Sequence, residues 1–120
     1  MEALSYPKFL VERFYRSTFN RNFAEAERLL GRIRARLPKS DWGKGYITAL
    51  EGVLATYKAK DDKYVFISKL PNDREQLLKA AEEFRLRKES QVSSEFDKGF
   101  FSAWEYLAKM LAEGRISRPS

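Results

Sequence analysis

The sequence predicts an all-α protein, a single-domain bundle of about five helices that spans residues 1–120. Three observations indicate this fold class. Apolar residues recur at helical spacing along each long segment, and capping residues or prolines separate the segments. In addition, one helical segment, residues 41–51, recurs as residues 95–105. A chain of 120 residues has the length of one domain with one core.

The internal repeat organises the predicted bundle. Four residues of the first copy, Lys44, Gly45, Ala49 and Glu51, recur unchanged in the second as Lys98, Gly99, Ala103 and Glu105. Five further positions keep their type: acidic, aromatic, aromatic, hydroxyl and large apolar. We therefore expect two related helical hairpins, each ending in one copy, with an N-terminal helix that covers one end of the core.

The first predicted helix begins near Ser5, because a serine before Tyr6-Pro7 is a typical N-cap with proline in the first turn. It ends at about Phe19. One broad side of it is apolar and consists of Leu10, Val11, Phe14, Tyr15 and Phe19.

The second predicted helix begins at Asn22, which has a glutamate three residues later, as in a capping box, and it stops at Pro38. Its apolar side consists of Phe23, Ala26, Leu30, Ile33 and Leu37.

The third predicted helix is capped by Ser40 or Asp41 and reaches about Lys60. It carries large apolar residues on one stripe and small residues, including Gly45, Ala49 and Gly52, on a second. Glycine in a helix costs about 1 kcal/mol against alanine, so this stripe indicates the close approach of another helix. We expect Tyr106 of the second copy to fill the space at Gly52, in which case Gly52→Leu would destabilise the fold.

Residues 61–70 are ambiguous between a short helix and a short extended piece, and we favour the helix. The fourth predicted helix begins at Pro71-Asn72 and points Leu77, Leu78, Ala81 and Phe84 inward before it ends in the charged residues 85–89. The fifth begins at the N-cap Ser94 and ends at Gly114, and residues 115–120 form a frayed tail.

The second helix resembles part of a known repeat family. Phe23, Ala26, Leu30, Ile33 and Pro38 resemble the second-helix half of a tetratricopeptide repeat. The resemblance implies stacking of helical hairpins and carries no peptide-binding role. The two repeat segments are also similar to small all-helical archaeal proteins of unknown function, which implies no activity.

The composition limits the function. The chain has no cysteine and no histidine, which removes thiol chemistry, the commonest general base and the commonest transition-metal ligand. Charged residues are 33% of the chain, whereas Asn, Gln and Met are scarce, as in proteins from hyperthermophiles. With no long apolar run and no pattern of a cleaved signal peptide, we expect a cytoplasmic protein without membrane contact.

The net charge of +6 is concentrated in the first third of the sequence. The second helix carries a series of cations, the candidate nucleic-acid or anion-binding residues Arg28, Arg32, Arg34, Arg36 and Lys39. Arginines one turn apart match the spacing at which a helix follows a phosphate backbone. The alternative is a solvated surface in which Glu25 and Glu27 pair with Arg28 and Arg32.

No other group of residues forms a candidate for catalysis. The repeated Lys44, Glu51, Lys98 and Glu105 lie away from the apolar stripes, so we expect them to be exposed to solvent. A carboxylate-metal site between Glu51 and Glu105 is the remaining enzymatic alternative. We expect no cofactor.

These observations favour a non-enzymatic helical binding module that contacts RNA, DNA or a ribonucleoprotein through its arginine-rich helix. The alternative is a protein-interaction domain or a self-assembling scaffold, in which an apolar strip such as Ile47 and Leu54, or Tyr64 and Phe66, contacts another chain or a second copy.

Overall fold

The computed structural model describes residues 8–59 and 70–117. Within them it contains five α-helices and no strand: α1 (Lys8–Phe19), α2 (Phe23–Arg36), α3 (Asp41–Ala59), α4 (Arg74–Glu89) and α5 (Glu95–Ala112). The predicted all-α class is confirmed. The predicted start at Ser5 and the conformation of 61–69 lie outside the described residues.

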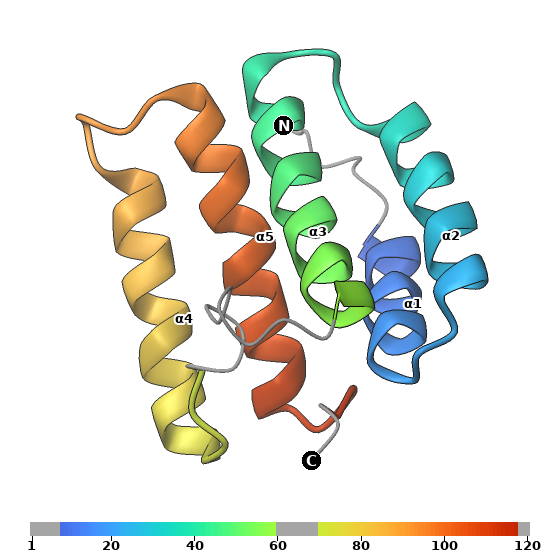
Figure 1. Ribbon diagram of the computed structural model, residues 1–120. Helices are drawn as coiled ribbons and strands as arrows, with labels where there is room; N and C mark the ends of the chain where they lie inside the picture. The colour runs from blue at the N-terminus through green and yellow to red at the C-terminus, as the bar shows by residue number, and fades with distance from the viewer. Residues whose placement is uncertain (1–7, 60–69, 118–120) are drawn as a thin grey trace.

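Helices α3 and α5 form the centre of the molecule (Figure 1). Helix α4 packs along the outer side of α5, and α1 and α2 pack on each other on the side of α3. Helix α1 buries the apolar side that its spacing predicts, namely Leu10, Val11, Phe14, Tyr15 and Phe19. The Tyr15 hydroxyl also donates a 3.0 Å hydrogen bond to the Ala103 carbonyl oxygen, which connects α1 to α5.

Side-chain caps begin the helices close to the predicted positions. Asn22 Oδ1 accepts from the Glu25 amide at 3.4 Å, and Ser94 Oγ accepts from the Asp97 amide at 3.0 Å. Ser40 Oγ accepts from the Gly43 amide at 3.3 Å. Helix α4 is capped by Asp73, whose carboxylate accepts from the Gln76 amide at 3.1 Å. These bonds satisfy amides that have no partner inside the helix.

Helix α4 differs from its prediction in two ways. It continues through the charged residues to Glu89, because Arg85 pairs with Glu82 one turn before it and with Glu89 one turn after it. Leu78, predicted to face inward, has 38% of its surface exposed, whereas Leu77, Ala81 and Phe84 are buried. The inner side of α4 is therefore narrower than the sequence suggests.

The two repeat segments cross at their glycines. A Cβ atom on Gly45 would lie 1.9 Å from the Phe96 carbonyl oxygen, and one on Gly99 would lie 1.9 Å from the Trp42 carbonyl oxygen. Residues 42 and 45 are each 54 positions before 96 and 99, so the contact is reciprocal. The predicted close approach is present, and it brings main chain against main chain.

Other expectations at this crossing and at the C-terminus are wrong. Gly52 is exposed, and no atom would lie within 4 Å of a Cβ there, so it does not face Tyr106. The chain after α5 is also packed at its start. Ile116 is 4% exposed, and Arg115 pairs with Glu12 of α1 at 2.9 Å. Gly114 does end the helix as expected, with a φ of 73° that favours glycine.

The two predicted hairpins are not packed alike. Helix α4 makes extensive contact with α5, whereas α2 contacts α1 more than it contacts α3. Several contacts nevertheless recur 54 positions apart. The Thr48 hydroxyl donates to the Lys44 carbonyl oxygen and the Ser102 hydroxyl to that of Lys98, both at 2.7 Å. Common ancestry of the two segments stays a prediction.

Candidate functional site: the basic face of helix α2

Helix α2 fixes which of its side chains reach solvent. Ala26, Leu29, Leu30 and Ile33 are buried, and successive residues turn by about 100°. Their positions leave the arginines on the other side of the helix. Arg28, Arg32, Arg34 and Arg36 are all exposed, and Lys39 follows in the exposed loop. Arg28, Arg32 and Arg36 therefore follow one flank of α2, whereas Arg34 lies on the other flank, beside α3.

Two of these cations are neutralised within the protein. Arg28 donates to both oxygens of Glu25, with N–O distances of 2.8 and 2.6 Å. Hydrogen bonding by Arg28 holds the pKa of Glu25 below its usual range and raises the pKa of the arginine. Arg34 reaches across to α3 and pairs with Glu51 at 2.7 Å. The expected pairing of Glu25 with Arg28 is thus present, whereas Glu27 pairs with Lys58 of α3.

The other three cations, Arg32, Arg36 and Lys39, differ from Arg28 and Arg34 in their surroundings. All three are exposed, and none forms an ion pair with a carboxylate in residues 8–59 or 70–117. Arg36 is also in the last turn of α2, where a cation complements the negative end of the helix dipole. We call these three residues the basic patch. The structure thus divides the five predicted residues into two paired arginines and three cations without an ion pair among the described residues. Of these three, Arg32 is near enough to Glu25 to help lower the pKa of that carboxyl.

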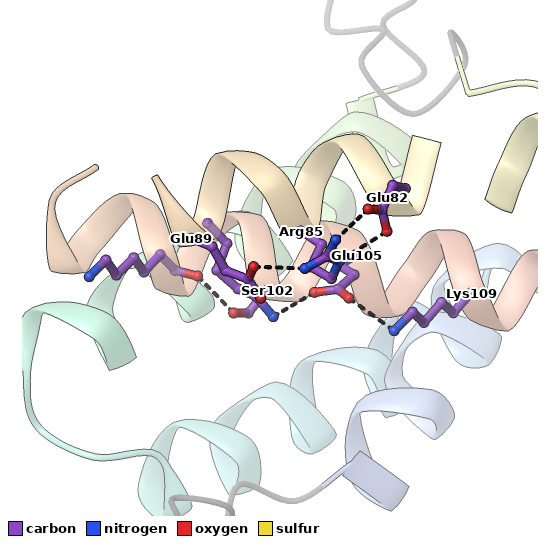
Figure 2. Close-up of polar contacts among 8 residues, drawn as sticks. Glu82, Arg85, Glu89, Ser102, Glu105 and Lys109 are labelled. Carbon is purple, nitrogen blue, oxygen red and sulfur yellow. Dashed lines mark hydrogen bonds and ion pairs between the residues drawn. The ribbon is translucent and has the colours of Figure 1, made fainter. Parts of the chain in front are cut away.

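The repeated charged residues do not all lie in solvent as expected. Lys44 and Glu51 are exposed, but Glu105 is 6% exposed, so this expectation is wrong for Glu105. Lys88 of α4 contacts its Oε1 at 2.6 Å, and Lys109 of α5 contacts its Oε2 at 2.9 Å. Figure 2 shows Lys109 directed toward Glu105, with Arg85 between Glu82 and Glu89 nearby.

The two lysines keep Glu105 ionised. Burial raises the pKa of this carboxyl, but the hydrogen bonds and the positive charges of Lys88 and Lys109 together outweigh burial and hold the pKa below its ordinary value. The sequence does contain a sign of one of these pairs, because Lys109 lies four residues after Glu105 on the same helix. The second partner depends on how α4 packs, and helical spacing does not show this.

The two carboxylates do not form a common site. Glu51 is bound by Arg34 of its own hairpin, and Glu105 is bound by Lys88 and Lys109 of the other. In the described part of the chain, no group of three or more Asp or Glu side chains is placed to hold a metal ion. None of the described helices combines the length and apolar character needed to cross a lipid bilayer.

Comparison with protein-family models, with curated proteins and with solved structures finds no match. A functional argument for this chain therefore depends on its own surface.

Proposed function

We propose that the protein is a non-enzymatic helical module of the cytoplasm that binds the phosphate backbone of RNA or DNA through the basic patch of Arg32, Arg36 and Lys39. The observation that carries this proposal is that none of the three forms an ion pair with a carboxylate of the described residues. Arg28 and Arg34 support the patch indirectly, because they already pair with Glu25 and Glu51, the nearby carboxylates.

The spacing within the patch suits a nucleic-acid strand. Arg32 and Arg36 are separated by four residues, which corresponds to a rise of about 6 Å along the helix. Two nucleotides of one B-form DNA strand rise by about 7 Å. The two guanidinium groups can therefore contact phosphates that lie two nucleotides apart on one strand. Because phosphate contacts carry no base information, this mode of binding is insensitive to sequence and sensitive to salt.

Fluorescence anisotropy with labelled single-stranded and duplex oligonucleotides tests the proposal. With about three phosphates neutralised, a plot of log K against log salt should have a slope of about −2 to −3. The double variant Arg32→Ala/Arg36→Ala should weaken binding at least about tenfold and reduce this slope by about two.

The matched control is Arg74→Ala/Lys79→Ala on α4, which changes the net charge by the same amount at exposed positions. It should bind nearly as the parent does. Equal loss in both double variants would show that net charge alone attracts the oligonucleotide. Affinity that does not depend on salt would contradict the proposal as a whole.

A protein-interaction role is the second candidate, and the exposed apolar residues near the loop between α4 and α5 favour it. Val92 is 93% exposed and Leu86 is 55% exposed. The strip expected from Ile47 and Leu54 is not available, because Leu54 is buried, and Tyr64 and Phe66 lie outside the described residues.

Light scattering over a range of concentrations tests self-association, and Val92→Ser/Leu86→Ser should abolish any dimer. A monomer throughout would exclude the self-assembling form.

A further inference from the structure

A groove of about 730 Å³ lies on the surface of α5, between the beginning of α1 and the end of α4, and Trp42 of α3 also lines it. It is lined by the beginning of α1, by Lys88 near the end of α4, and by one side of α5 that includes Glu105, Tyr106 and Lys109. Its volume is within the range of about 300–1,000 Å³ that is typical of small-molecule sites. The arginines of the basic patch do not line it.

One end of the groove carries an excess of positive charge. Lys88 and Lys109 share the single carboxylate of Glu105, so these three side chains keep one net positive charge. The other charged lining residues, Lys8 and Arg115 against Glu12 and Glu113, balance one another. Each ammonium group has three N–H donors, and each contact with Glu105 uses one of them. Lys109 is also 48% exposed. The cluster can therefore donate hydrogen bonds to an anion without losing its internal pairing.

The carboxylate in this cluster is a fixed point for the two cations. Glu105 has little exposure and is held on α5, so the lysine ammonium groups converge on a defined position instead of moving freely in solvent. A prearranged pair of cations binds an anion with a smaller loss of conformational entropy than two independent surface lysines do.

On the α1 side of the groove, an exposed aromatic ring lies next to the charged residues Lys8 and Glu12. Phe9 is 72% exposed. A single exposed phenylalanine needs no explanation, but this one lines the same groove as the charged cluster. Tyr106 adds a second aromatic ring, and its hydroxyl donates to the Lys8 carbonyl oxygen at 3.2 Å. The groove therefore offers aromatic surface together with charge-assisted donors.

We propose that this groove is a second binding site, which takes a small organic anion with a flat or apolar body. The anionic group is held by Lys88 and Lys109, and the body lies against Phe9 and Tyr106. The site is independent of the nucleic-acid binding proposed for the basic patch.

Titration with 8-anilinonaphthalene-1-sulfonate, an aromatic sulfonate whose fluorescence increases in apolar sites, tests this proposal on the whole chain. The parent protein should bind the dye saturably. Phe9→Ala and Lys109→Ala should each weaken binding at least about tenfold. Phe9 is largely exposed, so its replacement leaves the fold intact, and circular dichroism with thermal unfolding checks both variants.

Two controls locate the site. Lys79→Ala, which removes an exposed lysine of α4 outside the groove, should leave dye affinity unchanged, as should Arg32→Ala/Arg36→Ala. Adenosine monophosphate should displace the dye at concentrations at which inorganic phosphate does not. Absence of saturable binding, parental affinity in the Phe9 or Lys109 variant, or loss of binding in either control variant would overturn the proposal.

Discussion

Two ion pairs that occupy corresponding positions have different surroundings. Arg34 pairs with Glu51, and Lys88 pairs with Glu105. The two cations are 54 positions apart in the sequence, and so are the two carboxylates. The Glu51 side chain is 48% exposed and that of Glu105 only 8%. Removal of a hydrogen-bond partner from a buried charge costs more than removal of one from an exposed pair.

Lys88→Ala should accordingly reduce the free energy of unfolding by about 1–3 kcal/mol. Lys109 remains to neutralise Glu105 in this variant, which keeps the loss moderate. Arg34→Ala is the matched control and should cost less than about 1 kcal/mol. Urea unfolding of both variants measures the difference. Equal losses would contradict the buried role of Glu105.

The pKa of Glu105 predicts the dependence of stability on pH. Because Lys88 and Lys109 outweigh burial and hold this pKa below its unfolded value of 4.5, the ionised carboxylate stabilises the fold above about pH 4.5. That contribution is lost as the pH falls through the lower pKa of the folded state. Glu105→Gln should therefore be destabilising at pH 7, and the difference from the parent should shrink toward pH 3.

Unfolding free energies of both proteins at several pH values between 3 and 7 measure this effect. Groups common to both chains contribute nearly equally and cancel in the difference. A difference that stays constant or grows on acidification would show that the two lysines do not stabilise the ionised form.

At the scale of single residues, the sequence predicted surface position better than it predicted partners. The exposure of Arg28, Arg32 and Arg36 follows from the period of one helix. That Arg34 is neutralised follows from an interhelical contact with Glu51, which helical spacing does not show. The burial of Glu105 depends likewise on α4, so its role in the proposed anion-binding groove was not predictable.

At the scale of helices, the crossing of α3 and α5 is the most demanding contact of the fold. A methyl group on Gly45 or Gly99 would meet a carbonyl oxygen of the opposite main chain at 1.9 Å, and main chain cannot move aside as a flexible side chain does. Gly45→Ala and Gly99→Ala should each cost about 3 kcal/mol or more.

Gly31→Ala provides the control within α2. No atom would lie within 4 Å of its Cβ, so alanine should stabilise the helix by about 0.5–1 kcal/mol. Thermal unfolding of the three variants measures the expected loss of stability at Gly45 and Gly99 and the expected gain at Gly31. A neutral Gly45→Ala would be incompatible with the observed crossing.

The helices themselves were largely predictable because their ends are encoded locally. Asn22, Ser94 and Gly114 each act through hydrogen bonds or backbone angles within a few residues of their own position. The end of α4 was not predicted, because ion pairs of Arg85 stabilise the helix through a run of charged residues that we expected to end it. The crossing at Gly45 was predictable since glycine in mid-helix is costly unless another chain segment approaches it.

At the scale of the molecule, α1 is joined to the opposite end of the sequence. The Tyr15 hydroxyl and the Ala103 carbonyl oxygen are 88 residues apart in the chain and 3.0 Å apart in space. Tyr15→Phe should cost about 1–2 kcal/mol, since the hydrogen bond is buried. Equilibrium unfolding measures this loss. A change of less than about 0.3 kcal/mol would indicate that the packing of the ring, and not the hydroxyl, holds α1 in place.

The all-α fold class was predictable from the sequence, whereas the arrangement of the helices was predictable only in part. Helical periodicity and the repeat predicted five helices and a central pair, and both are present. The sequence suggested two equivalent hairpins, but α2 packs mainly on α1, and α1 has no counterpart in the second half. An N-terminal helix outside the repeat removes the equivalence because it packs along α2, whereas α4 has only α5 as a helical neighbour among the described residues.

Helix α4 has a single helical neighbour, because among the five helices only α5 packs against it. Its amide protons should consequently exchange with deuterated solvent ahead of those in α3, through openings that leave the rest of the molecule folded. These local openings would break the contact between Lys88 and Glu105 from time to time. The rate at which molecules enter and leave the groove beside it would then be governed by a motion of the outermost helix.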